Sequence, residues 1–285
     1  MTPRQNAIIR QGRAAFGYTL LYIVLIAAGI TMIFPFIWMI STSLKQGSSV
    51  FVYPPQLLPI PPAWRNYADI FVKQPMLIAL LNSLKIAIIN TAGTLFTASM
   101  AAYGFAKIHF RFKNQLFMIL LATMMIPGQV TLIPIYVWFR KFGWVDTHYP
   151  LIVPAILCNA YGVFMLRQFF MTIPDSYSES AKIDGASQLV IFFRIMLPLC
   201  IPAMATLGLF SFMGNWNSFM GPLIYLNSKL KYTIPLMIRF FQNSYYSDWG
   251  LLMAASCVSI MPIIILYIFS QRYFIQGVVM SGLKG

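Results

Sequence analysis

The sequence predicts an all-α protein that crosses a membrane six times. Two observations support this fold class: a composition poor in charge and a series of long apolar runs. Of the 285 residues, 59% are hydrophobic and only 9% are charged, whereas a soluble globular domain carries about 25% charged residues. A bilayer core requires roughly 20 consecutive apolar residues for each helix that crosses it. Most of the surface is therefore expected to face lipid.

Six apolar runs are long enough to serve as membrane spans. They cover residues 17–41, 77–105, 115–138, 150–170, 196–226 and 251–271. The first run is too long for the apolar region of a signal peptide, and no small-residue cleavage site follows it, so we interpret it as a retained span. The chain thus divides into an amino-terminal segment, residues 1–16, and a six-span membrane domain, residues 17–285.

Basic residues give the expected orientation. An even number of spans places both termini on one side of the membrane. Arg4, Arg10 and Arg13 precede the first span, and the basic loop "KIHFRFK" at 107–113 follows the second. Positively charged loops prefer the cytoplasm, so we expect both termini to be cytoplasmic.

The motifs of ATPases, hydrolases and metalloenzymes are missing from the sequence. It contains no Gly-x-x-x-x-Gly-Lys-Ser/Thr stretch, which is the loop that cradles ATP in many ATPases. It also has no Gly-x-Ser-x-Gly or His-Glu-x-x-His pattern. The sequence therefore offers no candidate catalytic residues for an intramembrane enzyme. Cys158, Cys200 and Cys257 show no paired spacing and are typical of packing residues. We assign the chain no catalytic residue, no metal ligand, no cofactor of its own and no nucleic-acid partner.

One short stretch, "PDSYSESAKIDGAS" at 174–187, differs from its apolar surroundings. It holds Asp175, Glu179 and Asp184, half of the six carboxylates in the chain. We expect a helix of about three turns here, with Thr172 as a candidate cap and Pro174 in the first turn. Gly185 stands where a left-handed residue would end this helix, and Ser187 can cap a second helix that runs to Pro198. The first helix is too short and too polar to cross lipid.

Two interpretations of this stretch remain open from the residues alone. It is a solvated loop at the membrane surface, or it is a docking helix for a partner protein. Tyr177, Ala181 and Asp184 follow the i, i+4, i+7 spacing, which places them on one helical face. Such a mixed face suits a groove on a partner.

The segment "ESAKIDGASQLVIFFRIMLP" resembles the Glu-Ala-Ala…Gly…Ile-x-Leu-Pro motif of permease subunits of bacterial ABC importers. The chain departs from that motif at Ser180, where the family usually has Ala. The matching residues are Glu179, Ala181, Asp184, Gly185, Ile195, Leu197 and Pro198. Further stretches look like the carbohydrate branch, and more closely like the smaller, six-span partner of the maltose-type pair: "NY" at 66–67, "NSL" at 82–84, "AAYGFAK" at 101–107, "MIP" at 125–127, "RQFF" at 167–170, "WNSF" at 216–219 and "QGVVMSGLKG" at 276–285.

This resemblance implies a function and a set of partners. In such permeases the loop is a cytoplasmic coupling helix that inserts into an ATPase subunit, so Tyr177, Glu179, Ala181, Asp184 and Gly185 become the expected coupling residues. The implied partners are a second homologous permease, two ATPase subunits that bind ATP and Mg²⁺, a soluble substrate-binding protein and membrane lipid. The implied location is the bacterial inner (plasma) membrane.

Polar residues inside the spans are candidates for a substrate pathway, because such residues are costly in lipid and usually face a cavity or another helix. Sugars are bound by amide hydrogen bonds and aromatic stacking, and the fifth run offers both. Two competing interpretations are close helix packing along a stripe of small residues and a tryptophan at the membrane interface. The candidates are Asn90, Thr94, Gln129, Asn159, Asn215, Trp216 and Asn217.

The substrate implied by the resemblance is an oligosaccharide or a related polar solute. On the expected outer side, cations outnumber the three acids Asp69, Asp146 and Asp248. A basic surface attracts anions over long range, which favours an acidic sugar such as a uronate oligosaccharide or a sugar phosphate. The cations have three alternative partners: an acidic binding protein, the second permease and lipid phosphates.

Two other classes of function fit the sequence less well. A stand-alone secondary transporter normally carries ionisable residues deep in its spans, and the acids of this chain avoid the spans. A purely structural membrane anchor has no need for polar stripes in its helices.

Overall fold

The computed structural model describes residues 3–157, 159–242 and 248–282, and its regular elements are helical. The chain divides into two compact units. The first comprises Met1–Ile70 with Phe241–Val258, and the second comprises Phe71–Phe240 with Ser259–Gly285. The fold class predicted from the sequence is confirmed.

Four stretches of the described residues are long and apolar enough to cross a membrane without a sharp bend. They are Phe16–Ser43 in α1 (Pro3–Ser43), α3 (Met76–Lys107), Tyr149–Thr172, and Trp249–Gln271 in α14 (Trp249–Gly282). The third consists of α6 (Tyr149–Leu157) and α7 (Ala160–Thr172). Because α1 begins at Pro3, the predicted amino-terminal segment continues directly into the first span.

Two further spans are bent. Helices α4 (Lys113–Thr123) and α5 (Gly128–Lys141) meet at 92°, and Gln188–Leu199 meets α11 (Ile201–Trp216) at 77°. The first arm of the second pair comprises α9 (Gln188–Ile191), a π-helical turn (Phe192–Met196) and α10 (Leu197–Leu199). If each bent pair is one span, the total is the predicted six.

Prolines explain where these bends lie. Pro127 directly precedes α5, and Pro198 and Pro202 flank the break at Cys200. Each proline lacks the N–H that an unbroken helix needs. The fifth span therefore differs from the predicted run 196–226: it begins at Gln188 and ends at Trp216, and α12 (Met220–Tyr225) is a separate short helix.

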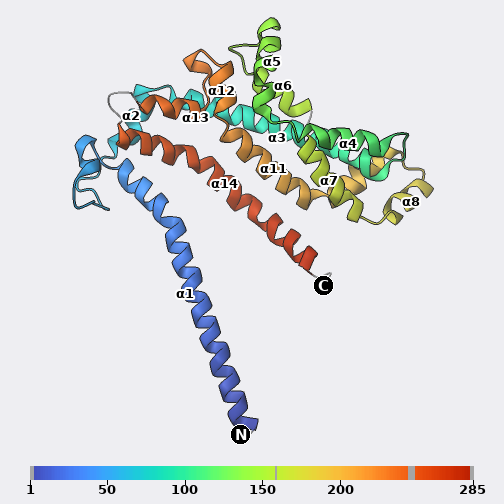
Figure 1. Ribbon diagram of the computed structural model, residues 1–285, viewed down its shortest axis with the longest axis horizontal. Helices are drawn as coiled ribbons and strands as arrows, with labels where there is room; N and C mark the ends of the chain where they lie inside the picture. The colour runs from blue at the N-terminus through green and yellow to red at the C-terminus, as the bar shows by residue number, and fades with distance from the viewer. Residues whose placement is uncertain (1–2, 158, 243–247, 283–285) are drawn as a thin grey trace. The chain divides into compact units, whose positions relative to one another are not determined.

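The core of the second unit lies where α3 packs against α7 and α11 (Figure 1). Its fully buried side chains include Leu166, Phe170 and Leu207. Gly93 of α3 lies so close to Ile156 that an added Cβ would overlap that side chain. Small residues along α3 thus permit close helix packing, as one interpretation of the sequence expected.

In the first unit, the end of α1 is fastened by α2 (Arg65–Lys73). The Asn66 side-chain amide donates to the carbonyls of Ser43, at 2.8 Å, and Lys45, at 2.9 Å. The hydroxyl groups of Tyr67 and Ser43 lie 2.8 Å apart. These contacts give the Asn-Tyr motif a structural role, because carbonyls at a helix end have no partner within the helix. The loop between α1 and α2 contains the 3₁₀ turn η1 (Gly47–Phe51).

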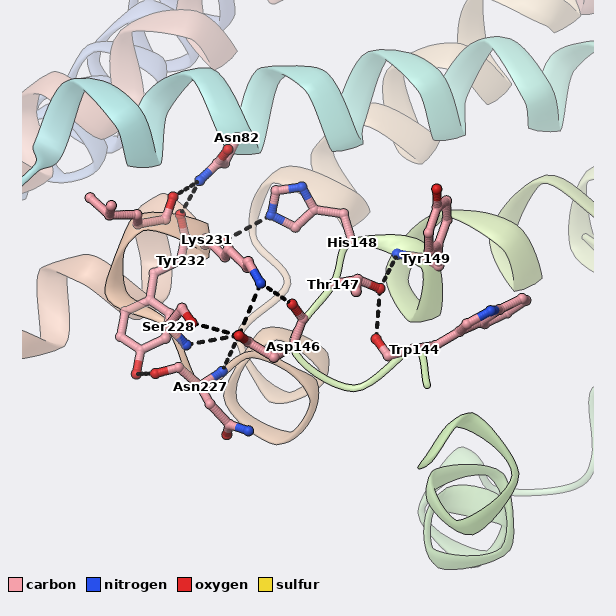
Figure 2. Close-up of polar contacts among 11 residues, drawn as sticks. Asn82, Trp144, Asp146, Thr147, His148, Tyr149, Asn227, Ser228, Lys231 and Tyr232 are labelled. Atoms are coloured by element: carbon pink, nitrogen blue, oxygen red, sulfur yellow. Dashed lines mark hydrogen bonds and ion pairs between the residues drawn. The ribbon is translucent and has the colours of Figure 1, made fainter. Parts of the chain in front are cut away.

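Asp146, in the loop between α5 and α6, organises a polar cluster in the second unit (Figure 2). Its carboxylate accepts the backbone N–H groups of Asn227, at 2.9 Å, and Ser228, at 2.8 Å, and the Lys231 ammonium at 3.0 Å. The Ser228 hydroxyl donates to the same carboxylate. These hydrogen bonds, those from Ser228 first, hold the pKa of Asp146 well below its ordinary value of 3.8. We call Asp146, His148, Asn227, Ser228 and Lys231 the Asp146 cluster.

The same cluster is tied to α3 (Figure 2). The Asn82 amide donates to the carbonyls of Leu230, within the short turn η3 (Lys229–Lys231), and of Tyr232, which directly follows it. The Ser83 hydroxyl accepts the N–H of Ile234, the first residue of α13 (Ile234–Ile238), which the 3₁₀ turn η4 (Arg239–Phe241) follows. Residues 226–234 are therefore held from two directions, by α3 and by the loop that precedes α6.

We expect Asp146→Asn to loosen residues 226–234. The amide group keeps one acceptor but loses the charge that Lys231 and Ser228 bind, so the opening free energy should fall by roughly 1–3 kcal/mol. Hydrogen exchange at the Asn227 and Ser228 amides of the purified chain measures this change. Asp69→Asn is the matched control, because Asp69 pairs with Arg65 inside α2. Equal exchange in wild type and Asp146→Asn would contradict the role given to this carboxylate.

The cluster should also weaken as the pH falls below 6.5, the ordinary pKa of histidine. His148 Nε2 lies 2.8 Å from the Lys231 carbonyl, which can only accept, so this nitrogen carries a proton. Burial, aided by Lys85 and Lys231 and opposed by that hydrogen bond and Asp146, lowers the pKa of His148 below its ordinary 6.5. Stability from the neutral imidazole is thus complete above 6.5 and is lost as the pH falls toward the folded-state pKa.

The slope of melting temperature against pH measures this effect. His148→Gln keeps a donor without a titrating group and should flatten the slope. His109→Gln, at an exposed position, should leave it unchanged. An unchanged slope in His148→Gln would show that another group causes the pH dependence.

Candidate functional site

The acidic stretch forms two helices joined at a glycine. Helix α8 (Ser176–Ile183) ends where Gly185 adopts a φ of 79°. The N–H of Gly185 bonds to the Lys182 carbonyl, and the N–H of Ala186 bonds to the Ala181 carbonyl, which together make a Schellman end. Ser187 then caps α9 by accepting the N–H of Val190 at 3.4 Å. The predicted roles of Gly185 and Ser187 are confirmed.

The start of α8 differs from the prediction. Thr172 is the last residue of α7, and its hydroxyl donates to the Phe169 carbonyl, so it does not cap α8. Asp175 precedes α8 but makes no side-chain cap. It pairs instead with the Lys107 ammonium at 2.6 Å, and this pair lowers the pKa of Asp175. Lys107 also donates to the Ile173 carbonyl at 2.6 Å, so the end of α3 is bonded to the residues just before α8.

The faces of α8 also differ from the expectation. Ala181 is 8% exposed and packs in the core, while Tyr177 and Asp184 are exposed, so these three residues do not form one docking face. Ser178 is the other buried residue of the helix. Ala181 therefore anchors α8 to the hydrophobic core.

The outward face of α8 follows from its geometry. At 100° per residue, the positions opposite Ser178 and Ala181 are Glu179, Ser180 and Ile183. All three are exposed, and Ile183 is 88% exposed. Ile183 is not among the residues predicted from the sequence, although it carries a recognisable signal: it is a large apolar residue in a mostly polar helix. Together with Glu179, it makes a surface with one anionic and one apolar contact point.

The polar residues of the second span make contacts between helices. The Asn90 amide donates to the Leu151 carbonyl at 2.9 Å and to Asn215 Oδ1 at 2.6 Å. The Thr94 hydroxyl donates to the Ala155 carbonyl at 3.1 Å. Because both Asn90 and Thr94 are fully buried, they fasten α3 to α6 and α11 and do not line an open surface in this conformation.

Trp216 is enclosed rather than presented to a substrate. It is 1% exposed and stacks on Phe212, with ring centres 5.7 Å apart. Its indole N–H donates to the Ser259 carbonyl at 3.1 Å. Both the predicted sugar-stacking role and the alternative of a membrane-interface tryptophan disagree with this burial. A buried ring with a satisfied N–H is a core residue.

The remaining candidates lie in three settings. Asn159 is half-buried and caps α7 by accepting the Gly162 N–H at 2.6 Å. Gln129 is exposed in the first turn of α5, just after the bend. Asn217 is exposed at the end of α11. Gln129 and Asn217 are thus the two predicted pathway residues that the structure leaves accessible.

Cysteines and other metal-ligating side chains form no centre in the part of the chain that the structure describes. No group of three or more His, Cys, Asp or Glu residues lies together there. Cys200 and Cys257 are buried free thiols, in keeping with a packing role, and Cys158 lies outside the described residues.

Comparisons with known proteins agree with this arrangement. The family model described as "Binding-protein-dependent transport system inner membrane component" matches residues 93–280. The arabinooligosaccharides transport system permease protein AraQ of Halalkalibacterium halodurans is 32% identical, over 86% of this chain and 86% of the relative. The polygalacturonan/rhamnogalacturonan transport system permease protein YtcP of Bacillus subtilis is 31% identical, over 93% of this chain and 97% of the relative.

A solved structure shares the fold. It is the crystal structure of a bacterial ABC transporter involved in the import of the acidic polysaccharide alginate. One of its chains matches with a TM-score of 0.80 at 24% identity, over 92% of this chain and 98% of that chain. The region matched by the family model contains α8 and both bent spans. The chain belongs to the family of binding-protein-dependent transport system inner membrane components, the permeases of ABC transporters.

Proposed function

We propose that this chain is a permease subunit of an importer for oligosaccharides, driven by ATP hydrolysis in partner subunits. The observation that carries the proposal is α8, a short polar helix with an ordered Gly185 end, seated on the core by Ala181 and exposing Glu179 and Ile183. The names of AraQ and YtcP, both transport system permeases for saccharides, support the substrate class. A stand-alone secondary transporter and a structural anchor both disagree with the family.

The partners follow from what the chain lacks and from its family. The sequence has no loop of the P-loop kind for ATP, so two ATPase subunits would bind ATP and Mg²⁺, and α8 would dock on one of them. The family description supports a substrate-binding protein and an inner-membrane location. A second homologous permease would complete the pathway, with both termini of this chain in the cytoplasm.

Coupling requires that the ATP-bound partners prefer one conformation of the permease. Movement of α8 would reach the spans through two contacts already described: the Lys107–Asp175 ion pair to α3, and the packing of Ala181 in the core. Tyr177, Glu179, Ile183 and Asp184 would make the contacts with the ATPase. Gly185 would hold the direction of α8 relative to α9.

A narrower second candidate is an acidic oligosaccharide. YtcP favours it, because polygalacturonan is by its chemistry a polyuronate. Exposed cations such as Arg140, Lys141 and Lys229 also favour it by attracting anions. The ion pairs Lys231–Asp146 and Arg65–Asp69 weigh against it, because they neutralise part of the expected basic surface.

Substitutions in α8 test the coupling role. Glu179→Lys reverses the charge on the outward face, and Gly185→Val forces a β-branched residue into a left-handed conformation, at a cost of order 1–3 kcal/mol. Each should lower substrate-stimulated ATP hydrolysis and uptake by roughly tenfold or more. Proteoliposomes that hold the complete transporter provide both measurements.

The matched control is Ser180→Ala, which lies on the same exposed face and introduces the residue usual in similar permeases. It should retain full activity, and all three variants should insert into the membrane in equal amounts. Normal uptake by both Glu179→Lys and Gly185→Val would refute the assignment of α8 as the coupling helix.

Uptake of matched sugars separates the two substrate candidates. If the substrate is acidic, uronate oligosaccharides should be preferred over neutral malto-oligosaccharides of equal length, and the preference should shrink as salt screens the attraction. Asn217→Ala should lower uptake of both series if this exposed amide lines the pathway. Trp216→Phe should leave the preference unchanged because the ring is buried. A preference for the neutral series would exclude the acidic candidate while leaving the permease assignment intact.

A further inference from the structure

The loop between α1 and α2 lines an open cavity of about 450 Å³. Its polar lining comes from Lys45, Gln46, Ser49 and Gln56, and prolines form much of the rest. A volume of this size falls within the range of small-molecule sites in proteins. All of the lining residues belong to the first unit.

The lysine that lines this cavity is buried beside an aromatic ring. Lys45 is 2% exposed, and its ammonium lies 4.7 Å from the centre of the Trp38 ring. Within the described part of the chain, no carboxylate pairs with it. Burial alone lowers the pKa of Lys45. A buried charge is normally paired with an opposite charge. The Trp38 ring therefore compensates the buried ammonium only in part.

The position of Lys45 is fixed by backbone contacts. Its N–H donates to the Thr42 carbonyl at 3.1 Å, and its carbonyl accepts the Asn66 amide at 2.9 Å. Gly250 packs so closely that an added Cβ would lie 2.5 Å from the Lys45 carbonyl oxygen. The backbone of Lys45 is thus held in an ordered framework, and the residue lines the cavity.

The surroundings indicate a membrane surface. Lys45 follows the end of the membrane-crossing helix α1 by two residues. Between 51 and 64, the loop exposes large apolar and aromatic side chains, among them Tyr53 at 92%, Ile60 at 90% and Trp64 at 66%. Aromatic residues of this kind gather where a bilayer meets water, at the depth where phospholipids carry their phosphate groups.

We propose that Lys45 and this cavity bind the phosphate group of a phospholipid at the membrane surface reached by the carboxyl end of α1. An ammonium is a compact point charge that binds phosphate well, and the amides of Gln46 and Gln56 add neutral donors. One cation matches the single charge of a phosphodiester, whereas free phosphate and phosphomonoesters carry a charge closer to −2. The bound lipid would hold the loop against the bilayer. This inference does not depend on the transported substrate.

Lipid binding to the purified full-length chain tests the proposal. Native mass spectrometry would follow added dioleoyl phosphatidylglycerol, with dioleoyl glycerol as the phosphate-free probe and inorganic phosphate as the free anion. We expect Lys45→Met to weaken phosphatidylglycerol binding roughly tenfold or more, because a charge-assisted contact is lost, and Lys45→Arg to retain it. Gln56→Leu, at an exposed position of the cavity wall, should weaken binding severalfold without changing the melting temperature.

Lys141→Met is the matched control. Lys141 also lies over a tryptophan, 5.1 Å from the centre of the Trp138 ring, but it is exposed, so its loss should leave lipid binding unchanged. The proposal is overturned if Lys45→Met and Gln56→Leu both bind the phospholipid as wild type does. It is also overturned if dioleoyl glycerol binds equally well, if inorganic phosphate displaces the lipid at millimolar concentration, or if Lys45 crosslinks to a partner carboxylate in the complete transporter with no lipid present.

Discussion

The fold depends on satisfying the backbone carbonyls that helix ends and bends leave without partners. Water cannot reach such groups inside a bilayer, so the protein must supply the donors itself. Side chains from other elements do so at several points: Asn66 bonds to the Ser43 carbonyl, Thr94 to Ala155 and Lys107 to Ile173. Each contact joins two elements, so the same hydrogen bonds that make broken helices tolerable also hold the helices together.

Local rules explain what the sequence could predict. Apolar runs gave the spans, and Gly185 and Ser187 occupied their predicted positions because their roles depend only on neighbouring residues. The fifth predicted run was shifted toward the amino terminus and breaks at Cys200, whereas the third was placed correctly and bends at Pro127. Asp175 was harder to place because its partner, Lys107, is 68 residues away, and no local pattern encodes such a contact. Ala181 and Trp216 were given partner-facing or substrate-facing roles because small and aromatic residues serve packing and binding alike, and only tertiary structure separates the two.

The few carboxylates are used mainly to neutralise particular cations. Asp146 pairs with Lys231, Asp175 with Lys107 and Asp69 with Arg65. The large formal charge of +14 therefore overstates the field that a distant anion meets, since a paired cation contributes little beyond the Debye length. The attraction for an anion that remains acts at short range, at Lys45. Its ammonium lies over the Trp38 ring and retains an unmet requirement for an anion. Its burial, rather than the count of cations, gives this site its specificity.

Helix α3 connects the two polar sites of the second unit. Near its first turns, Asn82 and Ser83 hold residues 230–234, and at its last residue Lys107 holds the segment that precedes α8. A continuous helix of 32 residues spans about 48 Å at 1.5 Å per residue, so these sites lie far apart on one stiff element. The two sites are too far apart to touch each other. A rigid shift of α3 would nevertheless move both of its ends together. Because the bonds at each end are few and specific, such a shift requires either that residues 226–234 move with α3 or that their bonds to Asn82 and Ser83 break. The Asp146 cluster favours the second outcome, since it fastens the same residues to the loop before α6 as well. If α3 shifts in this way during transport, α3 and Asp146 would compete for one segment, which would give a physical basis for two discrete states.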